Sequence, residues 1–301
     1  MKILVFGSLN IDRTYSVEHF VKPCETISAT RLDFFCGGKG FNQAVALARA
    51  GCDIYFAGAL GEDGAMLENA LSESNIRLDY LRHVPGPSGH AVIQLDPSGQ
   101  NCILISAGAN GCIDREYIDY VLSNFREGDY IVLQNEIPSV DYIIQAAKER
   151  KMTVVFNPSP FNGQIHKCKI SSVDYLMINE VEGAELSGTA DSKAMKEALH
   201  SAYPDTNIVL TLGAQGVLCI DRDGSEYSCG IYDVPVVDTT AAGDTFTGFF
   251  LAEIIESGDI QKALERASIA SGIAVSRKGA SPSIPCRGEV DSADKSKLRR
   301  I

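Results

Sequence analysis

The chain contains 301 residues, of which 45% are hydrophobic and 22% are charged, so it can form a large buried core and is not expected to be disordered. Its formal net charge is −12, from 27 Lys and Arg residues against 39 Asp and Glu residues. Because no basic run offsets this charge, the composition argues against a nucleic acid or a membrane surface as the partner.

Cysteine usage and the N-terminus indicate a reducing compartment. The nine cysteines are an odd number, and none of them forms a C-x-x-C pair. We therefore expect reduced thiols in a cytoplasmic protein. The first ten residues contain only one short apolar run, Ile3–Phe6, which is too short for a signal peptide or a membrane span.

The first third of the chain predicts short strands and two helices, from unbroken apolar runs and from apolar residues at helical spacing. Asp96–Gly99 is a strong turn signal, so the two runs that flank it form a hairpin. The predicted elements are a strand at Ile3–Phe6, a helix at Phe41–Ala50 ending at Gly51, a strand at Ile54–Ala57, a helix at Ala65–Ser74, and hairpin strands at His90–Leu95 and Asn101–Ile105.

From Tyr130 onward strands and helices alternate, which predicts a parallel sheet covered by helices on both faces. No linker or repeat divides the chain, so we expect a single α/β domain over residues 1–301. Segments at about 11–36 and 89–106 resemble strands inserted into this body as a small flanking sheet. The alternating strands are Tyr130–Leu133, Thr153–Phe156, Tyr175–Ile178, Ile208–Leu212 and Val217–Ile220, and the helices are Val140–Arg150, Glu180–Ser187 and Ser192–Ala202.

Polar residues follow the first predicted strand. Asn10 and Asp12 lie where open α/β sheets bind ligands, and their alternate spacing points both side chains the same way. A carboxylate and an amide can bind the hydroxyl groups of a polyol. Asn and Asp are also common in turns, so a structural role is the alternative.

A glycine-rich segment, Gly37–Asn42, precedes the first predicted helix. Its glycines allow close approach of a ligand, and Lys39 and Asn42 are able to bind hydroxyl groups; a purely structural turn is the alternative. The segment is not a P-loop, because Asp33 and Gly40 occupy positions that require Gly and Ser or Thr.

Two later strand ends are also candidates. Asn179 and Glu182 open a helix, where they either cap it or hold the water shell of Mg2+ on nucleotide phosphates. Thr211–Gly216 contains two glycines and suits the edge of a nucleotide. The five histidines show no metal-binding spacing, so we assign none of them to catalysis.

The most informative segment is Asp238–Gly248, in which three small residues precede Asp244 and an apolar helix follows. If Ala241–Gly243 open that helix, their unpaired N–H groups form an anion site, and Asp244 beside it would serve as a base. This combination indicates phosphoryl transfer to a hydroxyl. An ordinary helix start with Asp in its first turn is the other interpretation.

Taken together and in this order, these segments resemble the ribokinase (PfkB) family of carbohydrate kinases over nearly the whole chain. GGKGxNQA at Gly37–Ala44, Ala107–Asn110 and DTxAAGDTF at Asp238–Phe246 carry the resemblance. It implies a Rossmann-like, mostly parallel central sheet flanked by helices, with a small β-sheet lid that also forms a homodimer. The segments are most similar to the members that act on ribose, so the implied reaction is ATP-dependent phosphorylation of D-ribose at its primary hydroxyl.

The resemblance also implies roles for single residues. Asp244 would be the general base, and the backbone of Ala241, Ala242 and Gly243 would form the anion hole. The remaining implied contacts are sugar binding by Asn10, Asp12, Gly38, Lys39, Asn42 and Glu136; ATP binding by Asn179, Glu182, Thr211, Gly213, Gly216, Gly243 and Ser268; Mg2+ through water at Glu182; and a monovalent cation, usually K+, at Asp238, Thr240, Gly279 and Ser283.

Five residues depart from the family pattern: Cys24, Phe41, His90, Asn135 and Phe249. Cys24 replaces a glycine, and the two phenylalanines are interpreted as adjustments of the core. His90 and Asn135 replace apolar residues and would reshape the pocket for another sugar or a nucleoside. A non-catalytic sugar or nucleotide sensor is a further alternative, whereas an oxidoreductase lacks its phosphate fingerprint.

Overall fold

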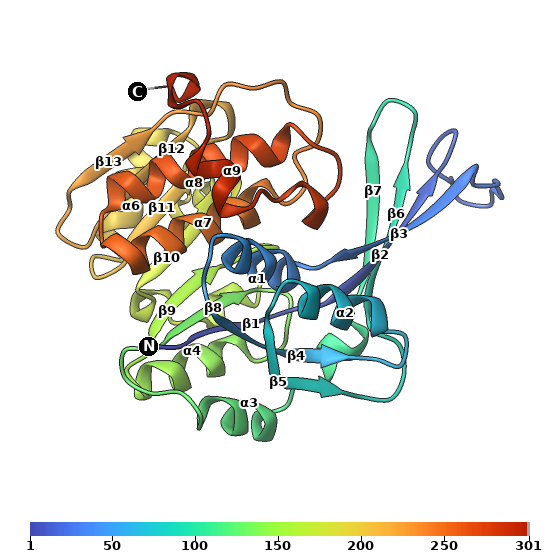
Figure 1. Cartoon of the computed structure of the whole chain (residues 1–301), viewed down its shortest axis with the longest axis horizontal. Helices are drawn as coiled ribbons and strands as arrows, with labels where there is room; N and C mark the ends of the chain where they lie inside the picture. Colours follow the sequence, from blue (N-terminus) through green and yellow to red (C-terminus); the bar gives the residue numbers. More distant parts are fainter. Residues whose placement is uncertain (300–301) are drawn as a thin grey trace.

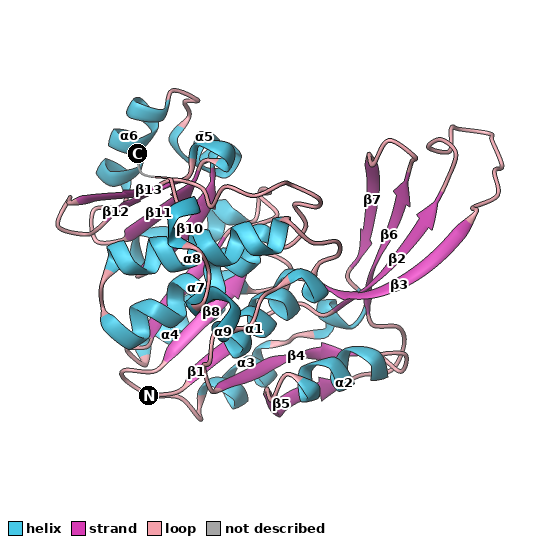
Figure 2. Ribbon diagram, turned by 45° about the horizontal axis from the view of Figure 1, so that its top comes forward, coloured by secondary structure: helices cyan, strands magenta, loops and turns pink. Residues whose placement is uncertain are grey.

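The structure is a computed structural model that describes residues 1–299. Its strands form two separate sheets, a large one at the centre of the body and a small one that projects from the body (Figure 1). Helices cover both faces of the large sheet, as Figure 2 shows in a second view. This arrangement confirms the predicted fold class.

The main sheet has nine strands, and all neighbouring strands are parallel except for the pairs β11–β12 and β12–β13. The carboxyl ends of its parallel strands therefore meet at one edge, where a ligand site is expected. In spatial order the strands are β13 (Glu226–Cys229), β12 (Val217–Ile220), β11 (Asn207–Thr211), β10 (Tyr175–Asn179), β9 (Thr153–Asn157), β8 (Tyr130–Gln134), β1 (Ile3–Phe6), β4 (Ile54–Leu60) and β5 (Arg77–His83).

Each face of this sheet has its own apolar core. Side chains alternate along β1, so Ile3 and Val5 enter one core while Leu4 and Phe6 enter the other. The first core is closed by α1 (Lys39–Arg49), α2 (Ala65–Glu73), α7 (Ala242–Ser257), α8 (Ile260–Val275) and the short α9 (Arg287–Asp291), and the second by α3 (Arg115–Leu122), α4 (Val140–Glu149) and α6 (Ser192–Ala202), with α5 (Glu180–Ser187) packed beside it.

The helix boundaries have local causes. Asp191 and Asp259 accept hydrogen bonds from backbone N–H groups in the first turns of α6 and α8. Gly188 and Gly258 adopt the left-handed conformation that ends α5 and α7.

The small sheet, called the lid below, contains β3 (Arg31–Gly37), β2 (Asn10–Ser16), β6 (Gly89–Leu95) and β7 (Asn101–Ser106), in this order. Strands β6 and β7 pair antiparallel across the predicted turn, and β2 pairs parallel with β6. Because β2 begins four residues after β1 ends, the lid is joined directly to the carboxyl edge of the main sheet.

The main differences from the predicted elements lie at the sheet's edges. The strand β12 is antiparallel to β11, because the few residues between them allow a turn but no crossover. The edge strands β5 and β13 and the helices α3, α8 and α9 were not predicted. Within residues 1–299, no helix combines the length and apolar character needed to cross a membrane.

Candidate active site

Asp244 lies in the first turn of α7 and is only 5% exposed. The chain enters this helix through Ala241, whose φ of 59° is unusual for a residue with a side chain. Within the described residues the N–H groups of Ala241 and Gly243 have no hydrogen-bond partner, whereas that of Ala242 donates to Thr239 O at 3.2 Å. The prediction that all three amides are free is therefore wrong for Ala242, since the entering turn uses it.

Two amide side chains from α1 hold the Asp244 carboxylate. Asn42 Nδ2 donates to Oδ2 at 3.1 Å, and Gln43 Nε2 donates to Oδ1 at 2.9 Å. Asn42 is 6% exposed, and its Oδ1 is buried with no hydrogen-bond partner. A buried acceptor without a partner is costly, so this atom is ready to accept a hydroxyl group of a ligand.

A cavity of about 550 Å³ opens between the lid and the carboxyl edge of the sheet, and we call it the acceptor pocket. Asn10 and Glu136 line it, as predicted for sugar contacts. Asn10 Oδ1 accepts from Asn110 Nδ2 at 2.8 Å, and Glu136 Oε2 accepts from Ser8 Oγ and, at 2.8 Å, from the Lys39 N–H. These polar side chains of the pocket are therefore hydrogen-bonded before any ligand binds.

Asp12 lies on β2 directly opposite Phe35 and beside Gly37 of β3. A Cβ atom at Gly37 would lie 2.1 Å from Asp12 Oδ2, so only glycine leaves room for this carboxylate. Burial and the neighbouring Glu136 carboxylate raise the pKa of Asp12 to about 7. Gly38, with φ of 91°, forms the turn from this strand into α1.

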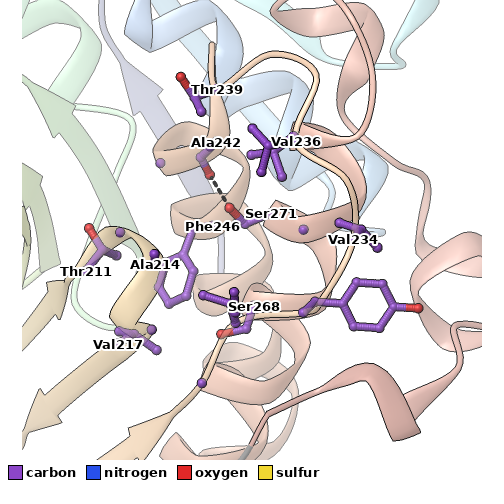
Figure 3. Close-up of a pocket in the computed structure, with 18 residues that line it drawn as sticks. Thr211, Ala214, Val217, Val234, Val236, Thr239, Ala242, Phe246, Ser268 and Ser271 are labelled. Atoms are coloured by element: carbon purple, nitrogen blue, oxygen red, sulfur yellow. Dashed lines mark hydrogen bonds between the residues drawn. The ribbon is translucent and has the colours of Figure 1, made fainter.

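A second cavity, of about 420 Å³, lies beside the N-terminal turn of α7 and is called the nucleotide pocket (Figure 3). Its walls are mainly apolar and include Phe246 of α7 and Val217 of β12. Ser271 Oγ donates to Ala242 O at 3.1 Å and so fixes the first turn of the helix against α8. Five of the residues predicted to contact ATP line this pocket: Thr211, Gly213, Gly216, Gly243 and Ser268.

A narrow space of about 70 Å³ lies beside Asp244, and Lys39, Asn179, Glu182 and Thr211 also line it. Asn179 and Glu182 cap α5 reciprocally: Asn179 Oδ1 accepts from the Glu182 N–H at 2.9 Å, and Glu182 Oε2 accepts from the Asn179 N–H at 3.0 Å. The capping interpretation is therefore confirmed, and it leaves Glu182 Oε1 free of these bonds.

Lys39 contributes a cation to the lining of this space. Burial alone would lower its pKa, but Asp244, Glu136 and Glu182 together raise the pKa of Lys39 above its ordinary value. The lysine therefore stays charged beside the carboxylates. No group of three or more His, Cys, Asp or Glu side chains in residues 1–299 has the arrangement of a metal site.

The four residues predicted for a monovalent cation lie in two connected loops. Asp238 accepts hydrogen bonds from the Thr240 N–H and Oγ1 and, at 2.9 Å, from the Gly279 N–H. Burial alone would raise the pKa of Asp238, but these bonds and the charge of Lys278 lower it below its ordinary value. Ser283 Oγ donates to Ala280 O at 2.7 Å in the second loop.

Phe41, Phe249 and His90 are three of the five residues that depart from the family pattern, and they lie away from the acceptor pocket. Phe41 and Phe249 are at most 1% exposed and belong to the first core, as expected. His90 aligns with Ile11 on β2, so it lies on the lid face opposite to Asn10 and Asp12. The hypothesis that His90 shapes the acceptor pocket is therefore wrong.

The other two departures lie in strained or pocket-lining positions. Asn135 does line the acceptor pocket, and its Nδ2 donates to Pro160 O at 2.7 Å. Cys24 adopts φ of 66°, the left-handed conformation for which glycine is favoured. All nine cysteines are free thiols.

Four buried polar residues at this site were not predicted as site residues: Ser8, Gln43, Asn110 and Gln134. Ser8 and Gln134 follow or end buried strands, the same signal that identified Asn10. Gln43 follows Asn42 within a helix whose neighbouring positions are apolar, which is an unusual place for an amide.

Comparisons with known proteins agree with this geometry. A family model described as pfkB family carbohydrate kinase matches residues 1–287. The chain is 35% identical over 298 residues to a ribokinase of Haemophilus influenzae, with 95% of this chain and 96% of that protein covered. It is 32% identical over 295 residues to a deoxyribokinase of Salmonella typhi, with 95% and 96% covered.

A solved structure of Arabidopsis thaliana ribokinase, complexed with ribose and ATP, superposes with a TM-score of 0.84 at 32% identity. The match covers 96% of this chain and 97% of that chain.

Proposed function

The chain belongs to the pfkB family of carbohydrate kinases, and we propose from this membership that it phosphorylates D-ribose at the primary hydroxyl, with ATP as the donor. One observation carries the proposal: the buried Asp244 carboxylate links the glycine-rich segment to the N-terminal turn of α7. Its carboxylate is bonded to Asn42, while the adjacent Gly243 lines the nucleotide pocket. The similarity to a ribokinase complexed with ribose and ATP supports the choice of sugar and donor.

In the proposed reaction Asp244 takes the proton of the acceptor hydroxyl. The sugar oxygen then forms a bond to the γ-phosphorus, the bond from that phosphorus to the β,γ-bridging oxygen breaks, and ADP leaves with the electron pair. The free N–H groups of Ala241 and Gly243 face the anionic group at the positive end of the α7 dipole. Lys39 adds a positive charge beside it.

The acceptor would be held by Asn10, Asp12, Asn42 and Glu136, together with the backbone at Gly38. Asn42 Oδ1 and the carboxylate oxygens supply acceptors for several sugar hydroxyls. The lid above the pocket would exclude water, which otherwise competes for the phosphoryl group.

The residues present also fit two metal ions. Glu182 is a carboxylate that lines the narrow space beside Asp244, which we call the phosphate space. A single carboxylate suits Mg2+, because this ion would be held mainly by phosphates and water. When bound, Mg2+ would neutralise charge on the transferred group. Asp238, Thr240, Gly279 and Ser283 provide hard oxygen donors for K+, which would add positive charge behind the anion site.

We also propose a homodimer through the lid, in the cytoplasm, where ATP is present and thiols stay reduced. The support for the dimer is a set of exposed apolar side chains on the two faces of the lid, and a partner lid would cover those on one face. They are Leu32, Phe34, Phe35, Ile103, Leu104 and Ile105, each between 39% and 71% exposed.

The Asp244→Asn variant tests the base assignment. We expect it to fold, to bind ribose in calorimetry, and to lose roughly 100- to 10,000-fold in turnover, the range of general-base contributions. Glu256→Gln removes an exposed carboxylate at the far end of the same helix and should leave turnover unchanged. Wild-type turnover by Asp244→Asn would refute the assignment.

The acceptor is tested by ADP release against pentoses, hexoses and nucleosides, each with K+ and with tetramethylammonium. We expect turnover on D-ribose, raised by K+. The deoxyribokinase relative makes 2-deoxy-D-ribose the second candidate. A higher kcat/KM for 2-deoxyribose would replace the first candidate with the second, and binding without any turnover would indicate a sensor.

A further inference from the structure

Gln43 is a buried side chain beside the active site to which the proposed reaction gives no role. It is completely buried on α1, and it lines neither the acceptor pocket nor the phosphate space. Its Nε2 nevertheless donates to Asp244 Oδ1 at 2.9 Å. Gln43 therefore contacts the proposed base without reaching either substrate.

The amide of Gln43 is itself held by the ends of two strands. Gln43 Oε1 accepts from Gln134 Nε2 at 2.7 Å, where β8 ends, and Gln43 Nε2 lies 3.3 Å from Asn157 Oδ1, where β9 ends. Asn157 Nδ2 donates in turn to Met177 O of β10. This chain of amides connects three neighbouring strands of the main sheet to the carboxylate on α7.

Glycines make room for this network. A Cβ atom on Gly7 would lie 2.1 Å from Gln134 Oε1, and one on Gly40 would lie 2.4 Å from Ser8 N. The close approach of α1 to β1 thus depends on residues without side chains. An apolar side chain at position 43 would fill the same space without a buried polar group, so the amide needs a reason beyond packing.

Several charged groups lie near Asp244, to which the Gln43 amide donates a hydrogen bond. Lys39 of α1 interacts electrostatically with three carboxylates, namely Asp244 in the first turn of α7, Glu136 after β8 and Glu182 of α5. Asp12 of the lid interacts electrostatically with Glu136. Because several charged groups share this region, the hydrogen bonds from Asn42 and Gln43 help to fix the orientation of the Asp244 carboxylate.

We propose that Gln43 is a positioning residue for proton abstraction. Its amide holds Asp244 by Oδ1 and keeps Oδ2, on the side of Asn42, directed at the acceptor hydroxyl. The proposal rests on the proposed function, in which Asp244 is the base. It adds that the sheet, through Gln134 and Asn157, sets the orientation of a carboxylate that belongs to a helix.

The Gln43→Met variant removes the amide and keeps the volume. Rates are measured as single turnovers between pH 5 and pH 9, so that product release does not mask the chemical step. We expect the rate at pH 7 to fall roughly 10- to 100-fold. We also expect the acid limb of the profile to move up by about one pH unit, because the carboxylate loses a donor, while the KM for the sugar changes less than about threefold.

Gln134→Met and Gln145→Met complete the experiment. Gln134→Met removes the hydrogen bond that holds Gln43 Oε1 but keeps the bond from Gln43 to Asp244. It should therefore shift the acid limb of the pH–rate profile in the same direction by a smaller amount. If Gln43→Met does not fold, Gln134→Met tests the positioning role instead. Gln145 is exposed on α4, and its variant should match the wild type.

A slower Gln43→Met enzyme with an unchanged acid limb would show a merely structural role and overturn the proposal, as would an unchanged rate. Failure of the proposed function gives a different result, namely an active Asp244→Asn variant.

Discussion

The acceptor pocket and the nucleotide pocket present different chemical surfaces. The nucleotide pocket has apolar walls and offers backbone N–H groups of the α7 N-terminus. The acceptor pocket has polar side chains that are already hydrogen-bonded, such as Asn10 to Asn110 and Glu136 to Ser8.

This difference reflects the ligands that each side would bind. A nucleotide offers a flat apolar base and phosphates, which apolar surface and helix N-termini bind without specific side chains. A sugar offers only hydroxyl groups, so recognition needs acceptors and donors at fixed positions. The acceptor side should therefore be more sensitive to substitution than the nucleotide side.

Gly40 and Gly243 allow the sharpest test of this comparison. A Cβ atom at Gly40 would lie 2.4 Å from Ser8 N, whereas one at Gly243 meets nothing within 4 Å. We expect Gly40→Ala to lose about 3 kcal/mol or more in the free energy of unfolding, because backbone atoms must move apart. The Gly243→Ala variant should have the same midpoint of denaturant unfolding as the wild type. Equal stability of the two variants would contradict the comparison.

The acceptor side also carries an electrostatic cost that depends on pH. Since the pKa of Asp12 is raised to about 7, the folded protein binds a proton there at pH values at which the unfolded chain does not. Its contribution to stability therefore falls as pH rises from about 4 to about 7. Asp12→Asn should be more stable than the wild type at pH 8, by roughly 2 to 3 kcal/mol after allowance for solvent, and nearly equal at pH 4.

Urea unfolding of both proteins at pH 4 and pH 8, without sugar, measures this difference. Asp79→Asn, an exposed carboxylate on β5, serves as the control and should show no such change with pH. The same stability difference between Asp12→Asn and the wild type at both pH values would show that burial of this carboxylate carries no cost.

The two sides also differed in how far the sequence predicted them. Five of the seven residues expected to contact ATP line the nucleotide pocket, and four of these five belong to strand-to-turn or helix-start segments. The other two, Asn179 and Glu182, line the narrow space beside Asp244. The segment from Asp238 to Gly248 needs no distant partner to form a helix start. Local patterns therefore suffice for such a site.

The acceptor side depends on contacts between distant segments, and there the sequence was less informative. Gln43 and Asp244 are 201 positions apart, and Asn10 and Asn110 are 100 apart. The orientation of His90 depended on the register between β2 and β6, since a shift of one residue would turn it to the other face. Neither register nor distant pairing can be derived from the local pattern.

Glu136 tests whether the acceptor side acts on the sugar alone. Its Oε2 accepts two hydrogen bonds, from Ser8 Oγ and the Lys39 N–H, and an amide nitrogen at this place would oppose both donors. We expect Glu136→Gln to raise the KM for ribose about 10- to 100-fold, or about 1.4 to 2.7 kcal/mol, and to leave the KM for ATP within about twofold. Glu127→Gln, at an exposed ion pair, is the control. A parallel rise in both constants would show that the two pockets are coupled.

The smallest expected effect concerns the tip of the lid. The lid belongs to the acceptor side, but a substitution at its tip should not affect sugar binding. Cys24 is exposed there with φ of 66°, a conformation that costs a residue with a side chain about 1 kcal/mol relative to glycine. Cys24→Gly should therefore raise the free energy of unfolding by up to about 1 kcal/mol. Because its backbone already has the conformation of glycine, the KM for ribose should stay unchanged. Cys112→Gly, at an exposed position with ordinary φ, should instead be neutral or destabilising. A changed KM in Cys24→Gly would mean that strain at the lid tip helps to shape the acceptor pocket.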